Sequence, residues 1–288
     1  MASLKEIKSR IQSVKSTQKI TSAMKMVSSA KLRKAQKTIE NFFPYEQRLN
    51  DLLNNFLSAE EKNASVFSEI REIKRVAIVV FSSNSSLCGS YNTNVAKLLT
   101  QTVEKYQNLG RENILIFPIG KKVAKASRKL GFAQETNFDT MADKPSYDAT
   151  LSLSDDLIQM YRNKDIDQIE LIYHHFKSRS TQVLTEETFL PLQLKPAEKG
   201  TVALDYIVEP DRETIMSELI PKVLRLKIYT ALLDSNASEH AARTMAMQMA
   251  TDNATDLLQE LSLQYNKSRQ QAITNELLDI IGGSFGQN

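Results

Sequence analysis

Residues 222–281 read KVLRLKIYTALLDSNASEHAARTMAMQMATDNATDLLQELSLQYNKSRQQAITNELLDII. These sixty successive residues contain neither glycine nor proline, the two residues that interrupt helices most strongly. A helix of this length exceeds the roughly 8–20 residues usual in globular proteins and is typical of a coiled coil. We expect it to begin after an N-cap at Asp211, to be disturbed at Pro221 and to end at Gly282–Gly283.

A second long segment opens the chain. Residues 1–43 also lack glycine and proline, and residues 3–6 (SLKE) form a capping box, in which serine and glutamate satisfy backbone N–H groups at a helix start. Apolar residues then recur at helical spacing until Gln18 and Thr21 interrupt the stripe. Pro44 lacks the N–H that a helix interior needs, so we expect it to kink or end this helix.

The two terminal segments carry opposite charge. Ten of the first 40 residues are Lys or Arg and two are acidic, whereas residues 236–281 hold three basic and six acidic residues. Small residues in the last segment, such as Ala237 and Ala241, let a second helix approach closely, so we expect the two helices to pair antiparallel. An acidic partner protein would also explain the basic helix. Nucleic acid is the alternative, although no aromatic residue for base stacking precedes Phe42.

Between these segments the pattern changes to alternating strands and helices, which is typical of βαβ units on a parallel sheet. The expected strands span 76–81, 114–119 and 169–173, and the expected helices span 92–109, 121–130 and 150–163. Two further strand-like runs, 182–192 and 202–208, flank a turn at 196–200 and predict a hairpin at an edge of the sheet.

The predicted fold class is therefore α/β, with a long antiparallel coiled coil of the N- and C-terminal helices flanking a central Rossmann-like α/β domain. We divide the chain into an N-terminal coiled-coil helix over 1–57, a linker over 58–75, a central α/β domain over 76–210 and a C-terminal coiled-coil helix over 211–288.

The loop after the first strand contains no nucleotide-binding motif. Residues 82–90 (SSNSSLCGS) include one glycine and no lysine, so neither a P-loop nor a GxGxxG pattern is present. The serines can line an anion site, but capping of the loop is the favoured role. Cys88 could be a nucleophile with His174 or His175 as its base. Because adjacent strand residues point to opposite faces, we favour a buried or partly buried thiol without a tuned base.

The remaining candidate residues also favour structure over chemistry. His240 has no second ligand at helical spacing, so no metal site and no bound cofactor are expected. Met245, Met247 and Met249 stand two residues apart and therefore spread around the helix. We interpret the three methionines as an apolar helix surface. At least one of them is expected to meet a partner other than the first helix.

Composition excludes several further classes. The longest apolar run, residues 76–81, has six residues, against roughly 20 for a membrane-spanning helix. The N-terminus lacks the apolar core of a secretory signal. A single cysteine cannot form an internal disulfide, so a reducing compartment is expected.

Two long motifs resemble those of a known family. Residues 11–27 (IQSVKSTQKITSAMKMV) and 30–35 (AKLRKA) resemble the N-terminal helix of the ATP synthase gamma subunit family, bacterial type. Residues 265–283 (YNKSRQQAITNELLDIIGG) resemble its C-terminal signature, and the layout of the chain fits as well. Three features depart from the family pattern: Ser284 replaces a common alanine, residues 84–86 (NSS) replace a frequent Asp-Arg-Gly, and the chloroplast-type cysteine pair is absent.

This resemblance implies a non-catalytic central-stalk rotor subunit of the F-type ATP synthase, which couples proton flow through the membrane rotor to ATP synthesis or hydrolysis. The implied partners are a ring of three alpha and three beta subunits around the coiled coil, and the epsilon subunit and the membrane c-ring at the α/β domain. The implied location is the cytoplasmic face of the bacterial inner membrane, with peripheral attachment through the complex. No nucleic acid and no cofactor are implied.

The resemblance also assigns partner contacts to individual residues. The residues expected to face the moving lever of the beta subunits are Met24 and Arg243. Those expected at the upper catch of the ring are Arg269, Gln270, Thr274 and Glu276. Those expected to contact the epsilon subunit and the rotor ring are Tyr206, Glu209 and Asp211.

Overall fold

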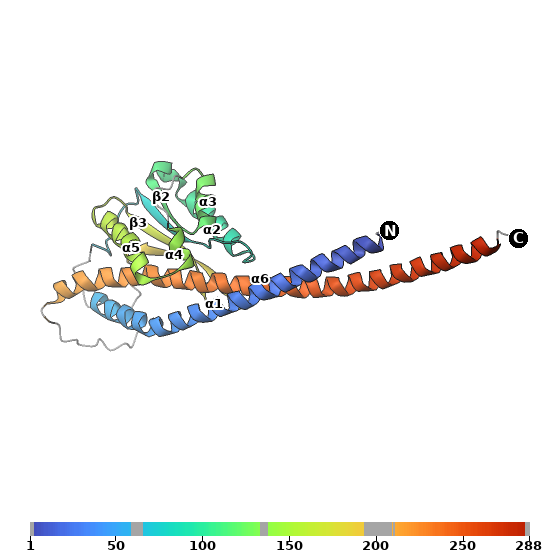
Figure 1. The fold of residues 1–288 in the computed structure, drawn as a ribbon. Helices are drawn as coiled ribbons and strands as arrows, with labels where there is room; N and C mark the ends of the chain where they lie inside the picture. Colours follow the sequence, from blue (N-terminus) through green and yellow to red (C-terminus); the bar gives the residue numbers. More distant parts are fainter. Residues whose placement is uncertain (1–2, 59–65, 133–137, 193–208, 210, 286–288) are drawn as a thin grey trace. The chain divides into compact units, whose positions relative to one another are not determined.

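The computed structural model describes residues 3–58, 66–132, 138–192, 209 and 211–285. It contains two compact units, a helical unit formed by residues 1–28 with 243–288 and an α/β unit formed by residues 29–242. Two long helices, α1 (Leu4–Ser58) and α6 (Arg212–Phe285), contribute residues to both units (Figure 1). The units group residues by contact rather than by succession along the chain, so the division into four successive segments stays a prediction.

A four-stranded sheet in the order β2-β1-β3-β4 forms the centre of the α/β unit. Three strands are parallel, namely β1 (Val76–Phe81), β2 (Ile114–Ile119) and β3 (Gln168–Phe176), and β4 (Gln182–Leu190) pairs antiparallel with β3. The connecting helices are α2 (Tyr91–Lys105), η1 (Gln107–Leu109), η2 (Arg111–Asn113), α3 (Lys121–Lys129), α4 (Asp139–Asp143) and α5 (Tyr147–Arg162). The predicted α/β fold class is confirmed, with long terminal helices beside a mostly parallel sheet.

The edge hairpin expected from the sequence is only partly described. Its first run is β4, and β4 forms a hairpin with β3 through the turn at residues 177–181. Its second run, 202–208, lies outside the described residues, so that pairing stays a prediction.

Helices cover both faces of the sheet. Every residue of β1 is buried, and alternate residues from Ala77 onward share a core with α5, α1 and α6. The intervening residues, from Val76 onward, share a second core with α2 and α3. Because neither face meets water, β1 reads as an unbroken apolar run instead of an alternating one.

The start of α1 has the predicted capping box. The backbone N–H of Ser3 donates to Glu6 Oε2 at 2.8 Å, and the N–H of Glu6 donates to Ser3 Oγ at 3.3 Å. The predicted disruption at Pro44 is wrong as to the end of the helix, because α1 continues to Ser58. Packing on both sides of the proline holds the helix in place: Phe42 meets the Tyr229 ring edge-on at 5.2 Å, and Leu49 is buried in the core.

The long last helix begins as expected and ends later than expected. Asp211 caps it, accepting a 2.8 Å hydrogen bond at Oδ1 from the backbone N–H of Thr214. The helix then runs through Pro221, and it continues past Gly282–Gly283 to Phe285. The prediction that the glycine pair ends the helix is therefore wrong. Glycine lacks a Cβ and so permits a left-handed helix stop, but it does not impose one.

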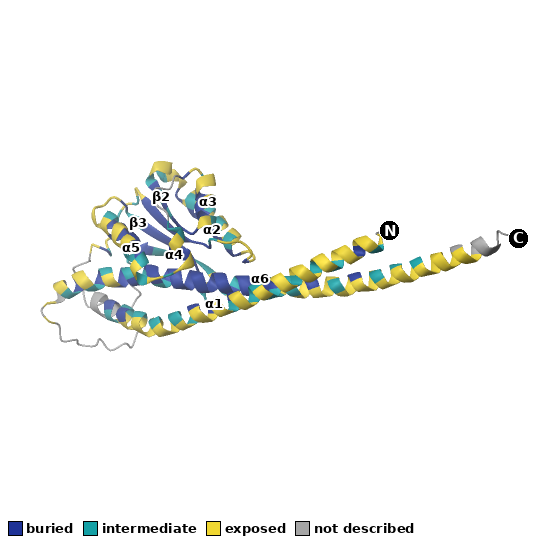
Figure 2. Cartoon of the chain, in the orientation of Figure 1, coloured by how far each residue is buried: buried dark blue, intermediate teal, exposed yellow. Residues whose placement is uncertain are grey.

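The part of α6 in the α/β unit is buried on all sides. Residues 231–241 are all buried, as the dark blue stretch of α6 in Figure 2 shows. Several of these residues are polar, and their side chains bond to the α/β layers. Ser235 Oγ lies 2.6 Å from Tyr91 Oη, Asn236 donates to the carbonyl of Ala142, and Ser238 donates to the carbonyl of His174. These contacts fix α6 against the sheet and its helices.

Candidate partner-contact sites

A layer of polar side chains joins α1 and α6 in the helical unit. Gln18 Nε2 donates to Thr255 Oγ1 at 2.8 Å, and the hydroxyl oxygens of Thr21 and Thr251 lie 2.8 Å apart. One helical turn further along α1, Lys25 Nζ donates to the side-chain carbonyl of Gln248 at 2.6 Å. Higher numbers on α1 meet lower numbers on α6, so the predicted antiparallel pairing is confirmed. Gln18 and Thr21 interrupt the apolar stripe because they belong to this polar layer.

Along α1 and α6, buried apolar residues precede and follow the positions of that layer. In the helical unit, Ile7 on α1 and Leu261 on α6 are buried. In the α/β unit, Leu32 and Ala35 share a buried cluster with Ala237 and Ala241. The small side chains of the two α6 alanines allow the close helix approach that the sequence predicts.

The helical unit leaves the last part of α6 without an opposite stretch of α1. Continuing the register of the polar layer brings Leu4, the first residue of α1, opposite residues 268–269. Residues 270–285 therefore extend beyond α1, as Figure 1 shows. This extension, which we call the α6 tip, exposes large apolar side chains: Ile273, Leu277, Leu278, Ile280 and Ile281.

The residues that the resemblance assigns to the alpha/beta ring differ in exposure. Met24 is half-buried, and Arg243 is only 7% exposed. A side chain as buried as Arg243 presents little of its guanidinium to a partner in the chain as described. The other four are exposed and lie together near or on the α6 tip: Arg269, Gln270, Thr274 and Glu276. None of these positions tests the contact itself, so all six contacts stay predictions.

The residues assigned to the epsilon subunit and the rotor ring are described in part. Tyr206 lies outside the described residues. Glu209 and Asp211 are exposed, and Asp211 is engaged as the N-cap of α6, where Oδ2 also accepts a 2.8 Å hydrogen bond from Thr214 Oγ1. A structural role for Asp211 is therefore established, and the partner contacts stay predictions.

The methionine group spreads around α6 as expected. Met247 is 4% exposed, whereas Met249 is 62% exposed and Met245 is exposed as well. Two of the three therefore present their side chains to solvent, and contact of at least one of them with a partner stays a prediction.

The predicted burial of Cys88 is confirmed. The residue is 1% exposed, and its sulfur accepts a hydrogen bond from Asn92 Nδ2 at 3.0 Å and lies 3.8 Å from Ser83 Oγ. Ser83 Oγ itself donates to the carbonyl of Ser85 at 2.6 Å. On this side of the loop the side chains bond to one another, which confirms the loop-capping interpretation for Ser83.

The two adjacent histidines face opposite ways. His174 is buried and stacks on the Tyr91 ring at 4.4 Å between centroids. Burial lowers the pKa of His174 to about 4, which keeps its imidazole neutral at pH 7. The His175 side chain is about half exposed, and its Nδ1 lies 2.6 Å from Asp234 Oδ2. The prediction that they cannot serve one site together is confirmed.

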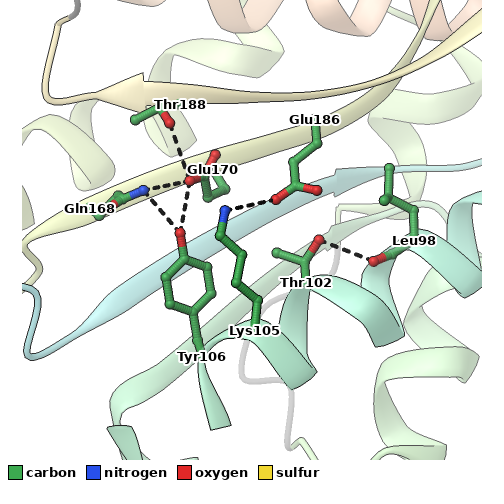
Figure 3. Close-up of polar contacts among 8 residues, drawn as sticks. All are labelled: Leu98, Thr102, Lys105, Tyr106, Gln168, Glu170, Glu186 and Thr188. Atoms are coloured by element: carbon green, nitrogen blue, oxygen red, sulfur yellow. Dashed lines mark hydrogen bonds and ion pairs between the residues drawn. The ribbon is translucent and has the colours of Figure 1, made fainter. Parts of the chain in front are cut away.

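A buried carboxylate escaped the sequence analysis. Glu170 on β3 is 2% exposed and accepts hydrogen bonds at Oε1 from Tyr106 Oη at 2.9 Å, from Thr188 Oγ1 at 3.2 Å and from Gln168 Nε2 (Figure 3). Burial, followed by the charge of Glu170, raises the pKa of the Tyr106 phenol above its usual range. One acidic residue within the otherwise apolar run 169–173 (IELIY) was the signal available in the sequence. The network joins the end of α2 to β3 and β4.

The described residues contain no group of three or more His, Cys, Asp or Glu side chains arranged to hold a metal ion. Likewise, none of the helices in the described part of the chain is both long enough and apolar enough to span a membrane.

Comparison with known proteins identifies the family. The family model described as ATP synthase matches residues 3–285. The chain is 61% identical over 289 residues to the ATP synthase gamma chain of Phocaeicola vulgatus, covering 99% of this chain and all of the relative. It is 51% identical to that of Parabacteroides distasonis and 43% identical to that of Flavobacterium johnsoniae, with coverage of at least 99% of each chain.

Solved structures agree on the fold. A chain of the Euglena gracilis mitochondrial ATP synthase, in a structure titled OSCP/F1/c-ring, superposes with a TM-score of 0.65 at 21% identity, over 98% of this chain and 94% of that one. A chain of the rotor structure from the same organism superposes with a TM-score of 0.60 at 19% identity, over 94% and 98%. The long motifs near both termini, the presence of two long helices and an α/β unit, and the full-length identity therefore agree, and the chain belongs to the ATP synthase gamma chain family.

Proposed function

We propose that the chain is the non-catalytic central-stalk rotor subunit of an F-type ATP synthase and couples proton flow through the membrane rotor to ATP synthesis or hydrolysis on partner subunits. The observation that carries this proposal is identity to gamma chains along the entire length of both proteins. The antiparallel pairing through the polar layer supports it, because a shaft that transmits torque needs two helices held in a fixed register.

The proposed partners divide into two groups, one that contacts the helical unit and one that contacts the segment before α6. The helical unit turns inside a ring of three alpha and three beta subunits, with Met24, Arg243 and the exposed residues near the α6 tip as contacts. The segment from Tyr206 to Asp211 contacts the epsilon subunit and the c-ring. The complex sits on the cytoplasmic face of the bacterial inner membrane, to which this chain is attached through its partners.

A covalent tie tests the rotor assignment, because a rotor moves relative to some neighbours and together with others. In the assembled complex, with Cys88 replaced by serine, Met24→Cys is bridged to a cysteine on a beta subunit. We expect the steady rate of ATP hydrolysis to fall to a small fraction of its normal value and to recover when the bridge is reduced. Met24 suits this test better than Arg243, because its side chain is the more accessible.

The matched control places the tie just before the start of α6. Glu209→Cys, an exposed position, is bridged to the c-ring, which rotates together with this chain in the proposed mechanism. Coupled turnover should then persist. Equal inhibition by both bridges, or no inhibition by the first, would rule out the rotor assignment.

A further inference from the structure

A cavity of about 570 Å³ lies within the α/β unit, between α1, the end of β3 and α6. This volume is within the roughly 300–1,000 Å³ range of small-molecule sites. Its apolar wall is largely aromatic, and its polar wall holds carboxylates. The apolar residues are Ile39, Phe42, Phe43, Phe176 and Leu233. We call this space the Asp234 cavity.

Lys227 lines the cavity together with Glu46 and Asp234, and it also pairs with Glu187, which lies outside the lining. Lys227 Nζ lies 2.9 Å from Glu187 Oε1, and the charge of Lys227 also acts on Glu46 and Asp234. Glu46 and Asp234 are near enough to oppose each other's ionisation. Tyr173 donates to Glu187, which satisfies an oxygen without adding positive charge. The lining of the cavity holds three carboxylates, Glu40, Glu46 and Asp234, against two lysines, Lys177 and Lys227, so its net charge is negative when all five are ionised.

His175 lies beside Asp234 at the polar wall. Its Nδ1 lies 2.6 Å from Asp234 Oδ2, and its side chain is about half exposed, so it holds that carboxylate in position mainly by a hydrogen bond. Burial raises the pKa of both Glu46 and Asp234, and the charge of Lys227 acts on each in the opposite direction. Two further charged residues line the cavity, Glu40 and Lys177, and both are exposed.

The chemistry of the walls selects one class of ligand. An anion would meet the carboxylates, and a metal ion is disfavoured because the described residues offer no group of three metal-ligating side chains. An organic ammonium fits both walls: its charge complements Glu46 and Asp234, and its apolar body and the cation itself interact favourably with aromatic rings. Phe43, which lines the cavity, is 48% exposed and is therefore accessible from solvent.

We propose that the Asp234 cavity binds a small amphipathic amine, with its ammonium group beside Glu46 and Asp234 and its apolar body against Phe42, Phe43 and Phe176. This site is separate from the rotor contacts proposed above and does not depend on them.

Three probes of matched shape and different charge test the proposal on the full chain. They are 2-phenylethylamine, which is cationic at pH 7, 2-phenylethanol, which is neutral, and 3-phenylpropionate, which is anionic. Titration followed by calorimetry or ligand-observed NMR gives each affinity. We expect the amine to bind about tenfold more tightly than the alcohol, and the anion to bind most weakly. Equal affinity for amine and alcohol, or no amine binding at about 10 mM, would overturn the proposal.

Two variants locate the site. Glu46→Gln keeps the shape and removes one charge, so the amine should lose about tenfold in affinity while the alcohol is unaffected. Phe43→Ala, at a half-exposed position that folding tolerates, should weaken amine and alcohol alike. Glu104→Gln on α2, an exposed residue that does not line the cavity, is the matched control and should change neither. Identical amine affinities for Glu46→Gln and Glu104→Gln chains with unchanged melting temperature would place the amine elsewhere and refute the assignment.

Discussion

The hydroxyl oxygens of Thr21 and Thr251 lie 2.8 Å apart across the paired terminal helices, although 230 residues separate them along the chain. Each hydroxyl also reaches a carbonyl of its own helix, Thr21 that of Gln18 and Thr251 that of Met247. Because each hydroxyl has a single proton, one of them donates to the carbonyl of its own helix while the other donates across the pair. A part-buried polar contact of this kind favours the register in which the two hydroxyls meet.

The first prediction concerns this threonine pair. Thr21→Val should weaken the helical unit by about 1 kcal/mol, because it removes one partner of a part-buried hydrogen bond. Combining it with Thr251→Val should cost less than the two single changes together, since matched apolar groups then face each other. Amide hydrogen exchange of the helical unit in the full chain measures the local opening free energy. Thr17→Val, which affects a hydroxyl bonded only within α1, is the control, and strictly additive costs would contradict the coupling.

The second prediction concerns acid stability. Burial lowers the pKa of His174 to about 4, against about 6.5 in an unfolded chain. Between these values the unfolded chain binds a proton that the folded chain excludes, so stability falls as the pH is lowered from about 6.5 toward 4. The full loss approaches about 3 kcal/mol below pH 4. Urea unfolding at several pH values measures it.

His174→Phe supplies the comparison for that experiment. The variant retains an aromatic ring to stack on Tyr91 but cannot titrate. Glu46 and Asp234, whose pKa values are raised by burial, act in the opposite direction, because they bind protons more readily in the folded chain. The readout is therefore the free energy of unfolding of the unmodified chain minus that of the His174→Phe chain. This difference should fall as the pH is lowered from 7 toward 4. A constant difference from pH 7 to pH 4 would contradict the prediction.

The third prediction concerns the Glu170 network. Tyr106→Phe should cost about 1 kcal/mol, because Glu170 keeps the donors on Gln168 and Thr188. Glu170→Leu should cost about 2–3 kcal/mol, because it leaves several buried hydroxyl and amide donors without their acceptor. Calorimetric melting resolves these losses. Lys105→Gln removes the 3.4 Å pair with Glu186 and the 5.1 Å contact of the ammonium with the Tyr106 ring but none of the hydrogen bonds to Glu170, so it should cost less than about 1 kcal/mol and serves as the control (Figure 3).

The fourth prediction concerns the single cysteine. Cys88 is 1% exposed, so iodoacetamide should modify the folded chain only at the rate of local opening and should modify the urea-unfolded chain rapidly. Val27→Cys in a Cys88→Ser chain places a thiol at an exposed position and should react at once. Cys88→Ser should leave an assembled complex active and insensitive to dithiol reagents. Equal alkylation rates for Cys88 before and after unfolding would show that the thiol is accessible.

The elements that followed from the sequence are those whose signals are local. The six apolar residues of β1, the capping box at Ser3 and the N-cap at Asp211 depend on neighbours only a few positions away. The long helices followed from the absence of glycine and proline. The helix end predicted at Pro44 was wrong because the lost backbone hydrogen bond is a local cost. The packing of Phe42 and Leu49 that offsets this cost comes from distant parts of the chain.

Features that depend on long-range register could not be read in advance. Gln18 and Thr21 stood out only as interruptions, because their partners, Thr255 and Thr251, lie more than 200 residues away. The burial of Arg243 and the bonds of Ser235 to Tyr91 likewise depend on how α6 packs. The family contacts came from motifs, and motifs assign a residue to a role without giving its exposure.

The α6 tip has a consequence for the life of the chain before assembly. About 16 residues of helix continue past the first residue of α1, and isolated helices of about 12–15 residues are marginal in water. The exposed Ile273, Leu277 and Ile280 gain nothing from a solvated helix. In the free chain this end should fray, be clipped first by proteases and adhere to other apolar surfaces. Burial in a complex would therefore protect the newly made chain from degradation.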